Sequence, residues 1–360
     1  MKQTTAQKNI IEDIYQKFPE DREVISQVIG KDVFADYHKY AQEEPSTIRK
    51  YRFYFKIYRG LAKAYWRLFL TLVFKRCYFG PFNGEFGNFI SYILPFLSYL
   101  HSKGVKINYC GMALYKPFMV NEKGELIVQD FVELRDFYKE ATPNANSAKI
   151  PGDVSGVVDE FKRNAKKSVT PFWDLSDSFF YWYIYRTWIL KGPFMRTPAF
   201  DKIYKTKDEN AAVIFPRNKY TDFNLPFGEP WDFRELAEAI SPYFDKVYIL
   251  GHPAFSVPLK ETNKIKILVT DNNAVLLEKC ANSKLILTQH SGTKYLGELT
   301  NTQVLLIYKG KMPIFGMLDN VIFNYKLGTK HNLHFAFSLN HVKQYCEKLS
   351  LSITNKIKQS

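Results

Sequence analysis

The sequence lacks the features by which several protein classes are recognised. Its four cysteines lie far apart and form neither a CxxC pair nor a zinc-ligand spacing: Cys77, Cys110, Cys280 and Cys346. We therefore expect reduced, buried thiols in a cytoplasmic protein. No apolar run reaches the roughly 18–20 residues of a membrane-spanning helix, and Met1 leads into polar sequence rather than a signal-peptide pattern. These absences predict a cytoplasmic protein that is soluble or bound peripherally at the inner face of a membrane.

Several catalytic signatures are missing as well. There is no GxSxG, HExxH or GxxxxGK[ST] sequence, and the glycines at 84 and 87 do not have the GxGxxG spacing. A serine hydrolase, a zinc enzyme, a P-loop kinase and a dinucleotide-binding fingerprint are therefore not supported. No DxD pair stands in a suitable place, so we expect neither a metal nor another cofactor.

Acidic residues are absent from Thr47 to Asn83. Six basic residues recur there at spacings of three and four, which aligns them along one side of a helix: Arg49, Arg52, Lys56, Arg59, Lys63 and Arg67. Aromatic and aliphatic side chains fill much of the remaining helix surface. A cationic stripe beside an aromatic face suits a helix lying in the plane of an anionic membrane. A solvated helix face and a nucleic-acid contact are the two alternatives, and the formal net charge of +14 favours an anionic partner in general.

The length and the pattern of the chain predict two α/β domains with extensions. With 360 residues and 46% hydrophobic residues, the chain can bury two sizeable cores. The aromatic content of 16% is high, and we interpret it partly as codon bias rather than function. We divide the chain into a helical, basic and aromatic segment at 1–75, a first α/β domain at 76–200, a second at 201–335, and a C-terminal helix at 336–360 that could cross back to the first domain.

The first domain opens with a predicted strand–turn–helix–strand unit. Strands at 77–82 and 105–109 flank a helix at 89–101, which Lys103-Gly104 ends. Pro95 should kink this helix unless the helix starts late. The rest of the domain is predicted as a strand at 125–131, a loop at 144–168, an aromatic helix at 172–190 and a domain boundary at 191–210.

The second domain alternates between strands and helices. Apolar strands are predicted at 211–215, 247–250, 265–269, 285–288 and 304–308, with helices from Pro230 to about Ile240 and at 273–279, 294–299 and 340–351. Repeated strand–turn–helix units predict a parallel, doubly wound sheet with helices on both faces.

Polar turns follow three of these strands, and the carboxyl ends of parallel strands are where ligands of such sheets bind. The turn from His290 to Thr293 precedes a helix whose first N–H groups suit phosphate. Arg217 could hold a diphosphate bidentately, with Lys219 as a point charge. The candidate donor-phosphate residues are Arg217, Lys219, His252, His290, Ser291, Gly292, Thr293 and Glu298. Each of them alone would also be unremarkable as a surface or loop residue.

Glu85 is the candidate catalytic residue of the first domain. It lies in the turn after the first strand, where a carboxylate can accept the proton of an attacking hydroxyl. The alternative is that Glu85 caps the following helix. Asp130, Glu133 and His252 are the other candidate bases. Gly84 and Gly87 allow a ligand to approach the backbone closely, and Asn88 completes this turn.

These motifs together resemble the GT-B glycosyltransferases, and more narrowly the heptosyltransferase-like group of bacterial surface-polysaccharide enzymes. The similar segments are Val213-Ile214-Phe215-Pro216-Arg217, Pro230-Trp231, Val247 to Gly251, Ser291-Gly292-Thr293-Lys294-Tyr295-Leu296, Val304 to Tyr308 and Gly84-Glu85-Phe86-Gly87. The resemblance covers roughly 76–310 with gaps. It departs from the group's pattern in the first turn, where that group has Asp after a glycine and this chain has Glu85 and Asn88.

The resemblance implies two doubly wound, Rossmann-like domains facing a cleft, an acceptor domain at 76–200 and a nucleotide-sugar domain at 201–335. It implies metal-independent, inverting transfer of a sugar from a nucleotide sugar to a glycan or lipid-linked acceptor. Two alternatives from other classes stay open: a basic nucleic-acid-binding protein, which we consider unlikely, and a non-catalytic scaffold with a degenerate transferase fold.

Overall fold

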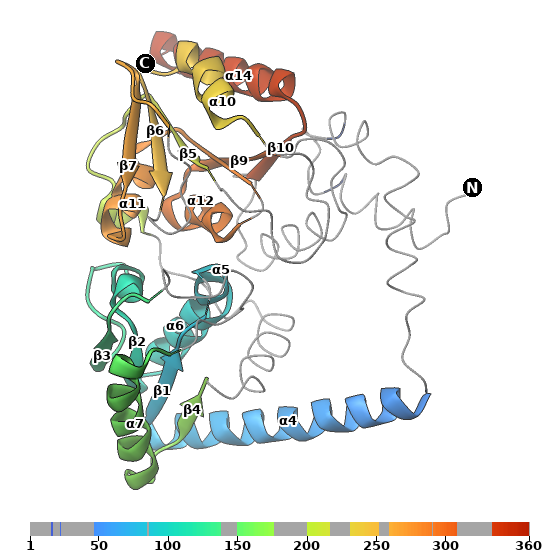
Figure 1. Cartoon of the computed structure of the whole chain (residues 1–360), viewed down its shortest axis with the longest axis vertical. Helices are drawn as coiled ribbons and strands as arrows, with labels where there is room; N and C mark the ends of the chain where they lie inside the picture. The colour runs from blue at the N-terminus through green and yellow to red at the C-terminus, as the bar shows by residue number, and fades with distance from the viewer. Residues whose placement is uncertain are drawn as a thin grey trace. The chain divides into compact units, whose positions relative to one another are not determined.

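The computed structural model describes residues 47–84, 86–137, 150–175, 200–216, 231–251, 259–289, 291–307 and 333–359, together with Gln16 and Arg22 (Figure 1). The chain divides into two compact units, which meet in sequence between Ile203 and Tyr204. This division lies inside the segment 191–210 that the sequence suggested as a boundary. Each unit is an α/β structure with one parallel sheet, as predicted.

The N-terminal unit contains a four-stranded sheet in the order β3-β2-β1-β4, with all neighbouring strands parallel. The strands are β1 (Arg76–Phe82), β2 (Lys106–Met112), β3 (Asp130–Leu134) and β4 (Phe172–Asp174). The first two confirm the predicted strands at 77–82 and 105–109. The predicted strand at 125–131 is wrong in position, because β3 begins only at Asp130, and Leu126 makes just an isolated bridge with Val120.

The crossover between β1 and β2 shows how the chain accommodates Pro95. A short helix α5 (Phe86–Asn88) and a π-helical segment η2 (Phe89–Ile93) lead into α6 (Leu94–Ser102), which Gly104 ends with a positive φ of 72°. Pro95 lies in the first turn of α6, where a proline's missing N–H costs no helical hydrogen bond. The wider π turn before it separates the two α-helical parts, so the crossover is not the single α-helix predicted at 89–101.

The predicted loop at 144–168 is wrong for its described part, which forms helix α7 (Gly152–Lys167). Val154, Val158, Phe161 and Ala165 recur at helical spacing and are buried. Asp153 in the first turn and two lysines in the last turn complement the helix dipole. The Gly, Pro, Ser and Lys content of the stretch 144–168 obscured this amphipathic helix.

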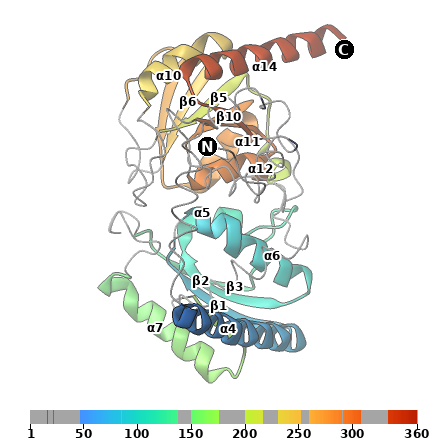
Figure 2. The ribbon, with the colours of Figure 1, turned by 90° about the vertical axis from the view of Figure 1, so that its right-hand side faces the viewer.

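Helices cover both faces of the four-stranded sheet (Figure 2). On one face Phe96 of α6 packs against Phe79 of β1, with ring centroids 5.7 Å apart. On the other face Phe161 of α7 meets Tyr78 edge-on at 5.5 Å. The start of the predicted aromatic helix at 172–190 is wrong, because Phe172–Asp174 forms strand β4; residues 176–190 lie outside the described residues.

The predicted basic helix is confirmed as α4 (Thr47–Phe74). Its last turns pack along the sheet, where Ala64, Leu68 and Thr71 are buried. The Thr71 hydroxyl accepts a 3.0 Å hydrogen bond from the indole N–H of Trp173, which lies in β4. The segment is therefore a structural part of the N-terminal unit.

The C-terminal unit contains a six-stranded parallel sheet in the order β10-β9-β8-β5-β6-β7. Its strands are β5 (Ala211–Phe215), β6 (Lys246–Gly251), β7 (Ile265–Val269), β8 (Leu285–Thr288), β9 (Gln303–Ile307) and β10 (Leu333–Ala336). The first five confirm the predicted strands to within a residue or so. Numbered within the unit, this is the strand order 3-2-1-4-5-6 of a dinucleotide-type doubly wound sheet.

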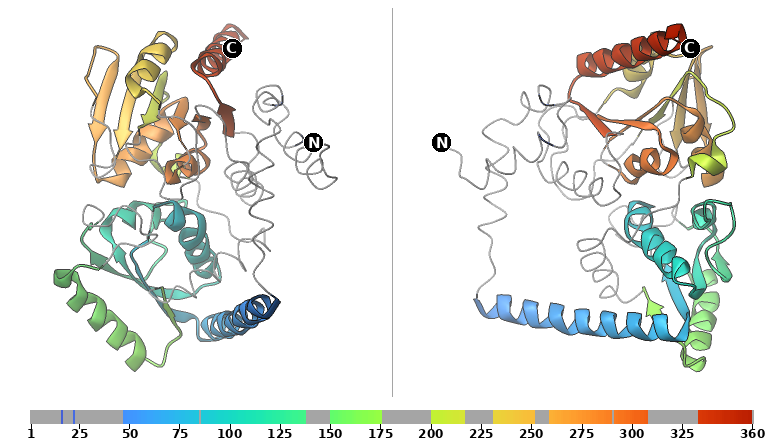
Figure 3. Two further views of the ribbon diagram at one scale, coloured as in Figure 1. Left: turned by 45° about the vertical axis from the view of Figure 1, so that its right-hand side comes forward. Right: turned by 180° about the vertical axis from the view of Figure 1, so that it is seen from behind.

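The two faces of this sheet carry different helices (Figure 3). The helices are α10 (Phe233–Ile240), α11 (Asn273–Asn282), α12 (Leu296–Thr300) and α14 (Leu339–Gln359). Alternate strand residues such as Ile214, Ile249 and Leu287 form one cluster with α10 and the first half of α14. Lys279 of α11 lies over the ring of Tyr248, which points to the opposite face. The predicted doubly wound layer is therefore confirmed.

The C-terminal helix was predicted at 340–351 and as able to cross back to the first domain. The structure extends it to Gln359, and its residues Val342 and Cys346 pack into the sheet cluster of its own unit. Strand β10, directly before it, was not predicted. All four cysteines are free and buried, as expected, and burial raises the pKa of the Cys110 and Cys346 thiols to about 12.

Candidate functional site

The topological switch point of the six-stranded sheet lies between β5 and β8. From β5 the chain winds towards β6 and β7, and from β8 it winds towards β9 and β10. Phe215 and Thr288, the last residues of β5 and β8, are aligned in register. Ligands of open α/β sheets bind outside the carboxyl ends of the strands at this point.

Three hydroxyl groups converge where β8 ends. The Thr288 and Thr293 hydroxyl oxygens are 2.5 Å apart, as are those of Ser291 and Thr293, and 3.3 Å separates Thr288 from Ser291. The backbone N–H of Thr293 also donates to the Ser291 hydroxyl at 3.3 Å. The predicted turn residues Ser291, Gly292 and Thr293 are thus brought together, and Thr288 joins them.

The local sequence explains why the chain turns here. Ser291 is the N-cap of the 3-10 helix η7 (Gly292–Tyr295), which continues into α12. A serine hydroxyl in this position accepts from an N–H group that has no partner within the helix. Further along, Gly297 allows α12 to pack closely against β9, because a Cβ atom there would lie 1.9 Å from the Val304 side chain.

Lys294 is a buried basic residue in the same turn. Its side chain is only 4% exposed, and its ammonium nitrogen lies 4.7 Å from the centroid of the Tyr295 ring. The aromatic face stabilises a cation at this distance. A lysine side chain is therefore held in the first turn after the hydroxyl cluster.

These groups suit a phosphorylated ligand chemically. A hydroxyl donates one hydrogen bond and accepts others, so the cluster of Thr288, Ser291 and Thr293 can turn its hydrogens towards an incoming anion. Hydrogen bonds to a charged group are stronger than those between neutral groups.

The remaining predicted donor residues are only partly within view. Glu298 is half-buried on α12 and takes no part in the hydroxyl cluster. Arg217, Lys219, His252 and His290 lie outside the described residues, so their roles stay predictions.

The turn after β1 is the predicted site of the N-terminal unit. Gly84 is buried, and its carbonyl oxygen accepts a 2.8 Å hydrogen bond from the Tyr115 hydroxyl. The Tyr115 ring stacks on Phe89 with centroids 4.2 Å apart, which fixes the donor. Gly87 and Asn88 are half-buried in α5. Glu85 lies outside the described residues.

The two alternative acidic bases differ in position. Asp130 was expected near the end of its strand but opens β3, at the amino edge of the sheet. Glu133 lies near the carboxyl end of β3 and is held in an ion pair with Lys116. Neither arrangement places a carboxylate beside the turn at Gly84.

The basic stripe of α4 is described only towards its C-terminal end. Arg59 and Lys63 are exposed, whereas Arg67 is half-buried and donates a hydrogen bond to the Phe172 carbonyl oxygen. The side chains of Arg49, Arg52 and Lys56 lie outside the described residues. Large apolar side chains on the same helix are exposed: Phe55, Tyr58, Tyr65, Trp66, Phe69, Val73 and Phe74. Among the described helices, none has the length and apolar character needed to cross a membrane.

Two residues of these sites were not predicted from the sequence. Thr288 was assigned only to a strand, although a threonine closing an apolar strand before a Ser/Thr turn is a usable signal. Tyr115 lies 31 residues after Gly84, so nothing local in the sequence connects them.

No protein-family model matches the chain, and no curated protein matches it in sequence. Solved structures similar to it include E. coli heptosyltransferase WaaC with ADP, at 11% identity, covering 76% of this chain and 99% of that one, with a TM-score of 0.45. E. coli ADP-heptose LPS heptosyltransferase II matches at 12% identity, 78% and 99% coverage and a TM-score of 0.45. A glycosyl transferase family 9 protein from Veillonella parvula matches at 13% identity, 77% and 97% coverage and a TM-score of 0.43. The motifs of the sequence resemble the same group, but at these identities and scores we base no functional assignment on the matches.

Proposed function

We propose that the chain is a glycosyltransferase that moves a sugar from a nucleotide-sugar donor to a hydroxyl of a glycan or lipid-linked acceptor. The observation that carries the proposal is the convergence of Thr288, Ser291 and Thr293 at the switch point of a 3-2-1-4-5-6 sheet. A nucleoside diphosphate is the ligand class that this position and this chemistry suit. The resemblance of the sequence motifs to GT-B enzymes supports the sugar as the transferred group.

The proposed reaction is a direct displacement that inverts the anomeric carbon. The acceptor oxygen forms a bond to that carbon, the bond between the carbon and the diphosphate oxygen breaks, and Glu85 takes the acceptor proton. The hydroxyl cluster, helped by Arg217 and Lys219, stabilises the departing diphosphate. Fixed positive and hydrogen-bonding groups then do the work that a metal does in other transferases.

The donor site is tested by calorimetry with UDP, GDP, ADP, CMP and dTDP. Thr293→Val keeps the side-chain shape and removes the hydroxyl. It should therefore lower the affinity for the tightest-binding nucleotide by roughly 10- to 100-fold, the range for the loss of a hydrogen bond to a charged group. Thr262→Val is the matched control, because Thr262 accepts a hydrogen bond from Ile265 at the amino edge of the same sheet. Equal losses in both variants, or no nucleotide binding at all, would remove the donor site from the switch point.

The catalytic role of Glu85 is tested by Glu85→Gln in a transfer assay. The amide retains the size of the side chain but cannot accept the acceptor proton, so turnover should fall by about 10²–10⁴-fold while nucleotide affinity stays the same. Full turnover in this variant would exclude Glu85 as the base. A loss of nucleotide binding instead would indicate a structural role.

We also propose that α4 holds the protein peripherally on an anionic membrane at its cytoplasmic face, near a lipid-linked acceptor. Exposed Trp66 and Phe69 lie on the same helix as exposed Arg59 and Lys63, the combination found in interfacial helices. In liposome flotation, Arg59→Glu with Lys63→Glu should reduce binding about tenfold or more. Arg163→Glu with Lys167→Glu, an exposed pair of the same spacing on α7, is the control. Binding that ignores salt and both variants would contradict the membrane role.

A further inference from the structure

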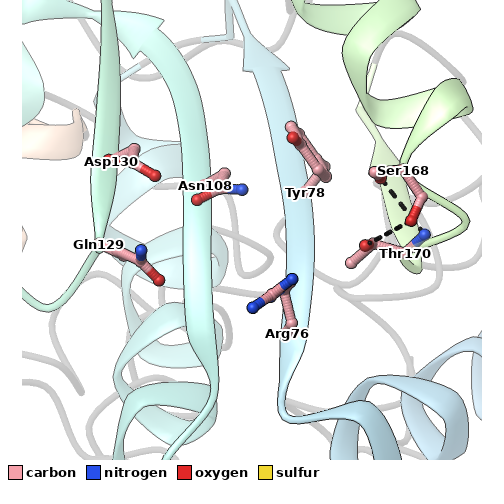
Figure 4. Close-up of a pocket in the computed structure, with 7 residues that line it drawn as sticks. All are labelled: Arg76, Tyr78, Asn108, Gln129, Asp130, Ser168 and Thr170. Carbon is pink, nitrogen blue, oxygen red and sulfur yellow. Dashed lines mark hydrogen bonds between the residues drawn. The ribbon is translucent and has the colours of Figure 1, made fainter.

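A polar cavity lies at the amino end of the four-stranded sheet, in the N-terminal unit (Figure 4). Its volume is about 270 Å³, and its lining is formed by Arg76, Tyr78, Asn108, Gln129, Asp130, Ser168 and Thr170. Neither the donor site nor the Gly84 turn includes any of these residues.

Three of the lining residues form a row across the sheet. Tyr78 of β1 is aligned with Asn108 of β2, and Asn108 with Asp130 of β3. Residues aligned in this way on parallel strands point to the same face, about 5 Å apart. An aromatic ring, an amide and a carboxylate thus stand side by side, on the face that α7 partly covers.

The other lining residues enclose this row. Arg76 begins β1, Gln129 directly precedes β3, and Ser168 and Thr170 come from the segment between α7 and β4. Ser168 and Thr170 are held in place by their own turn, in which the Thr170 hydroxyl donates to the Ser168 carbonyl at 3.1 Å.

Four of the lining side chains make no polar contact with the described part of the protein. Among the described residues, the side chains of Arg76, Asn108, Gln129 and Asp130 make no hydrogen bond or ion pair with one another or with a neighbour. Arg76 and Asp130 carry opposite charges in one cavity without pairing. Four planar polar groups, two of them amides, therefore converge on one small space with their bonding capacity free.

We propose that this cavity binds a neutral sugar unit. Arg76 and Asp130 cancel in charge, so the lining does not favour an anion, and one carboxylate is too few for a cation that prefers several oxygen ligands. Amide, carboxylate and guanidinium groups each offer two bonding positions in a plane, which matches neighbouring hydroxyls of a sugar ring. The half-buried Tyr78 ring adds an apolar surface for the C–H face of the sugar.

The cavity lies at the opposite end of the strands from the Gly84 turn, because β1 begins at Arg76 and ends at Phe82. It is therefore a second carbohydrate site that holds a glycan away from the reacting atoms. That the bound glycan is the acceptor or product of transfer rests on the proposed function; that the cavity binds sugar does not.

The test is saturation-transfer NMR on the full chain with neutral hexoses, N-acetylhexosamines and their short oligomers. The wild-type protein should give saturation transfer to at least one sugar, with a dissociation constant in the millimolar range expected for a few exposed hydrogen bonds. Asn108→Ala and Asp130→Asn should each lower the affinity for that sugar about fivefold or more. Asn164→Ala and Asp159→Asn, the same substitutions at exposed positions of α7, should leave it unchanged.

The outcomes separate this proposal from the proposed function. If Asn108→Ala weakens sugar binding and Thr293→Val leaves it unchanged, the sugar binds in the cavity. This conclusion holds even if the protein binds no nucleotide. Sugar binding that only Thr293→Val weakens would assign the sugar to the C-terminal unit and overturn the cavity. The absence of saturation transfer to every sugar tested would also overturn the proposal. So would binding of glycine or inorganic phosphate in place of sugar, if Asp130→Asn weakened that binding to the same extent.

Discussion

The two parallel sheets share the strand order 3-2-1-4, yet they are packed with different side chains. The sheet of the N-terminal unit is lined with rings, among them Phe79, Phe96, Tyr109 and Trp173, all fully buried. The sheet of the C-terminal unit is lined mainly with aliphatic residues: Ala212, Ile214, Val247, Ile249, Leu285, Leu287, Leu305 and Ile307. One topology is therefore stabilised in two chemical ways within one chain.

The difference accompanies the different size of the two sheets. A buried aromatic side chain removes 150–250 Å² from water, so a sheet of four strands can bury a large apolar area with few residues. Helices cover both faces of each sheet, and the six-stranded sheet spreads its buried area over more residues, which are mainly aliphatic. Part of the high aromatic content thus has a structural role in the N-terminal unit.

The carboxyl edges of the two sheets also differ in the polar groups that they carry. In the N-terminal unit the Tyr115 hydroxyl donates a hydrogen bond to the Gly84 carbonyl oxygen in the turn after β1. In the C-terminal unit three side-chain hydroxyls meet at the end of β8, and the buried Lys294 comes directly after them. Among the described residues, only the second edge gathers several side-chain hydroxyls in one cluster.

Removal of Trp173, a large ring in the core of the N-terminal unit, should have the largest effect on stability. Trp173→Ala should cost about 3–5 kcal/mol of unfolding free energy and also release the hydrogen bond to Thr71. Leu287→Ala, its counterpart in the aliphatic core, should cost about 2–5 kcal/mol. Hydrogen exchange followed by mass spectrometry should assign each loss to the unit that carries the substitution. Equal loosening of both units by either variant would mean that the two cores are not separate.

Two glycines test how tightly each unit is packed. Gly297→Ala places a methyl group 1.9 Å from Val304 and 2.7 Å from the Thr302 carbonyl oxygen, and should destabilise the C-terminal unit by about 1–3 kcal/mol. Gly156→Ala on α7 meets nothing within 4 Å and should stabilise the N-terminal unit by about 0.5–1 kcal/mol. Thermal melts compare them directly. A stabilising Gly297→Ala would show that α12 is not pressed onto β9.

Two tyrosine hydroxyls distinguish the units by their response to pH. Tyr248 donates to the Glu209 carboxylate at 2.7 Å, and Tyr115 donates to the neutral Gly84 carbonyl. Each change to Phe should cost about 0.5–1.5 kcal/mol at pH 7. Tyr243→Phe, which removes a hydroxyl that bonds no other described residue, is the control.

The pH dependence follows from the pKa of Glu209. Burial alone would raise this pKa, but the hydrogen bonds from Lys207 and Tyr248 outweigh burial and hold it below its usual value. A lowered folded-state pKa contributes stability that is present above the unfolded value of about 4.3 and disappears as pH falls through the folded value. The cost of Tyr248→Phe should therefore shrink between pH 6 and pH 3, whereas that of Tyr115→Phe should not. Parallel pH curves for the two variants would contradict the assignment.

Most of the C-terminal sheet could be predicted from the sequence. Its strands are short apolar runs bounded by polar or turn-forming residues, and such runs are the clearest local signal of a buried parallel strand. Strand β10 was missed because no clear alternation surrounds Leu333–Ala336. In the N-terminal unit α7 was missed because the whole stretch 144–168, rich in Gly, Pro, Ser and Lys, was interpreted as a loop, although Val154, Val158 and Phe161 keep the helical spacing.

The candidate sites were predictable only where they are local. The turn from Ser291 to Thr293 is contiguous, so the sequence indicated it, and the fold added Thr288 through register. The cavity of the N-terminal unit joins Tyr78, Asn108 and Asp130, which lie about 20–30 residues apart and meet only once β1, β2 and β3 are aligned. Pairing across strands is a tertiary property, and no local pattern encodes it.

The proposed donor site places a nucleoside diphosphate at the carboxyl edge of the sheet, where β8 ends. Hydrogen exchange of the full chain, with and without the nucleoside diphosphate that binds best, measures this directly. We expect the nucleotide to protect the segment from Thr288 to Thr300, and we expect this protection to be lost in Thr293→Val and retained in Thr262→Val. Protection confined to the N-terminal unit, or an unchanged segment at saturating nucleotide, would contradict it.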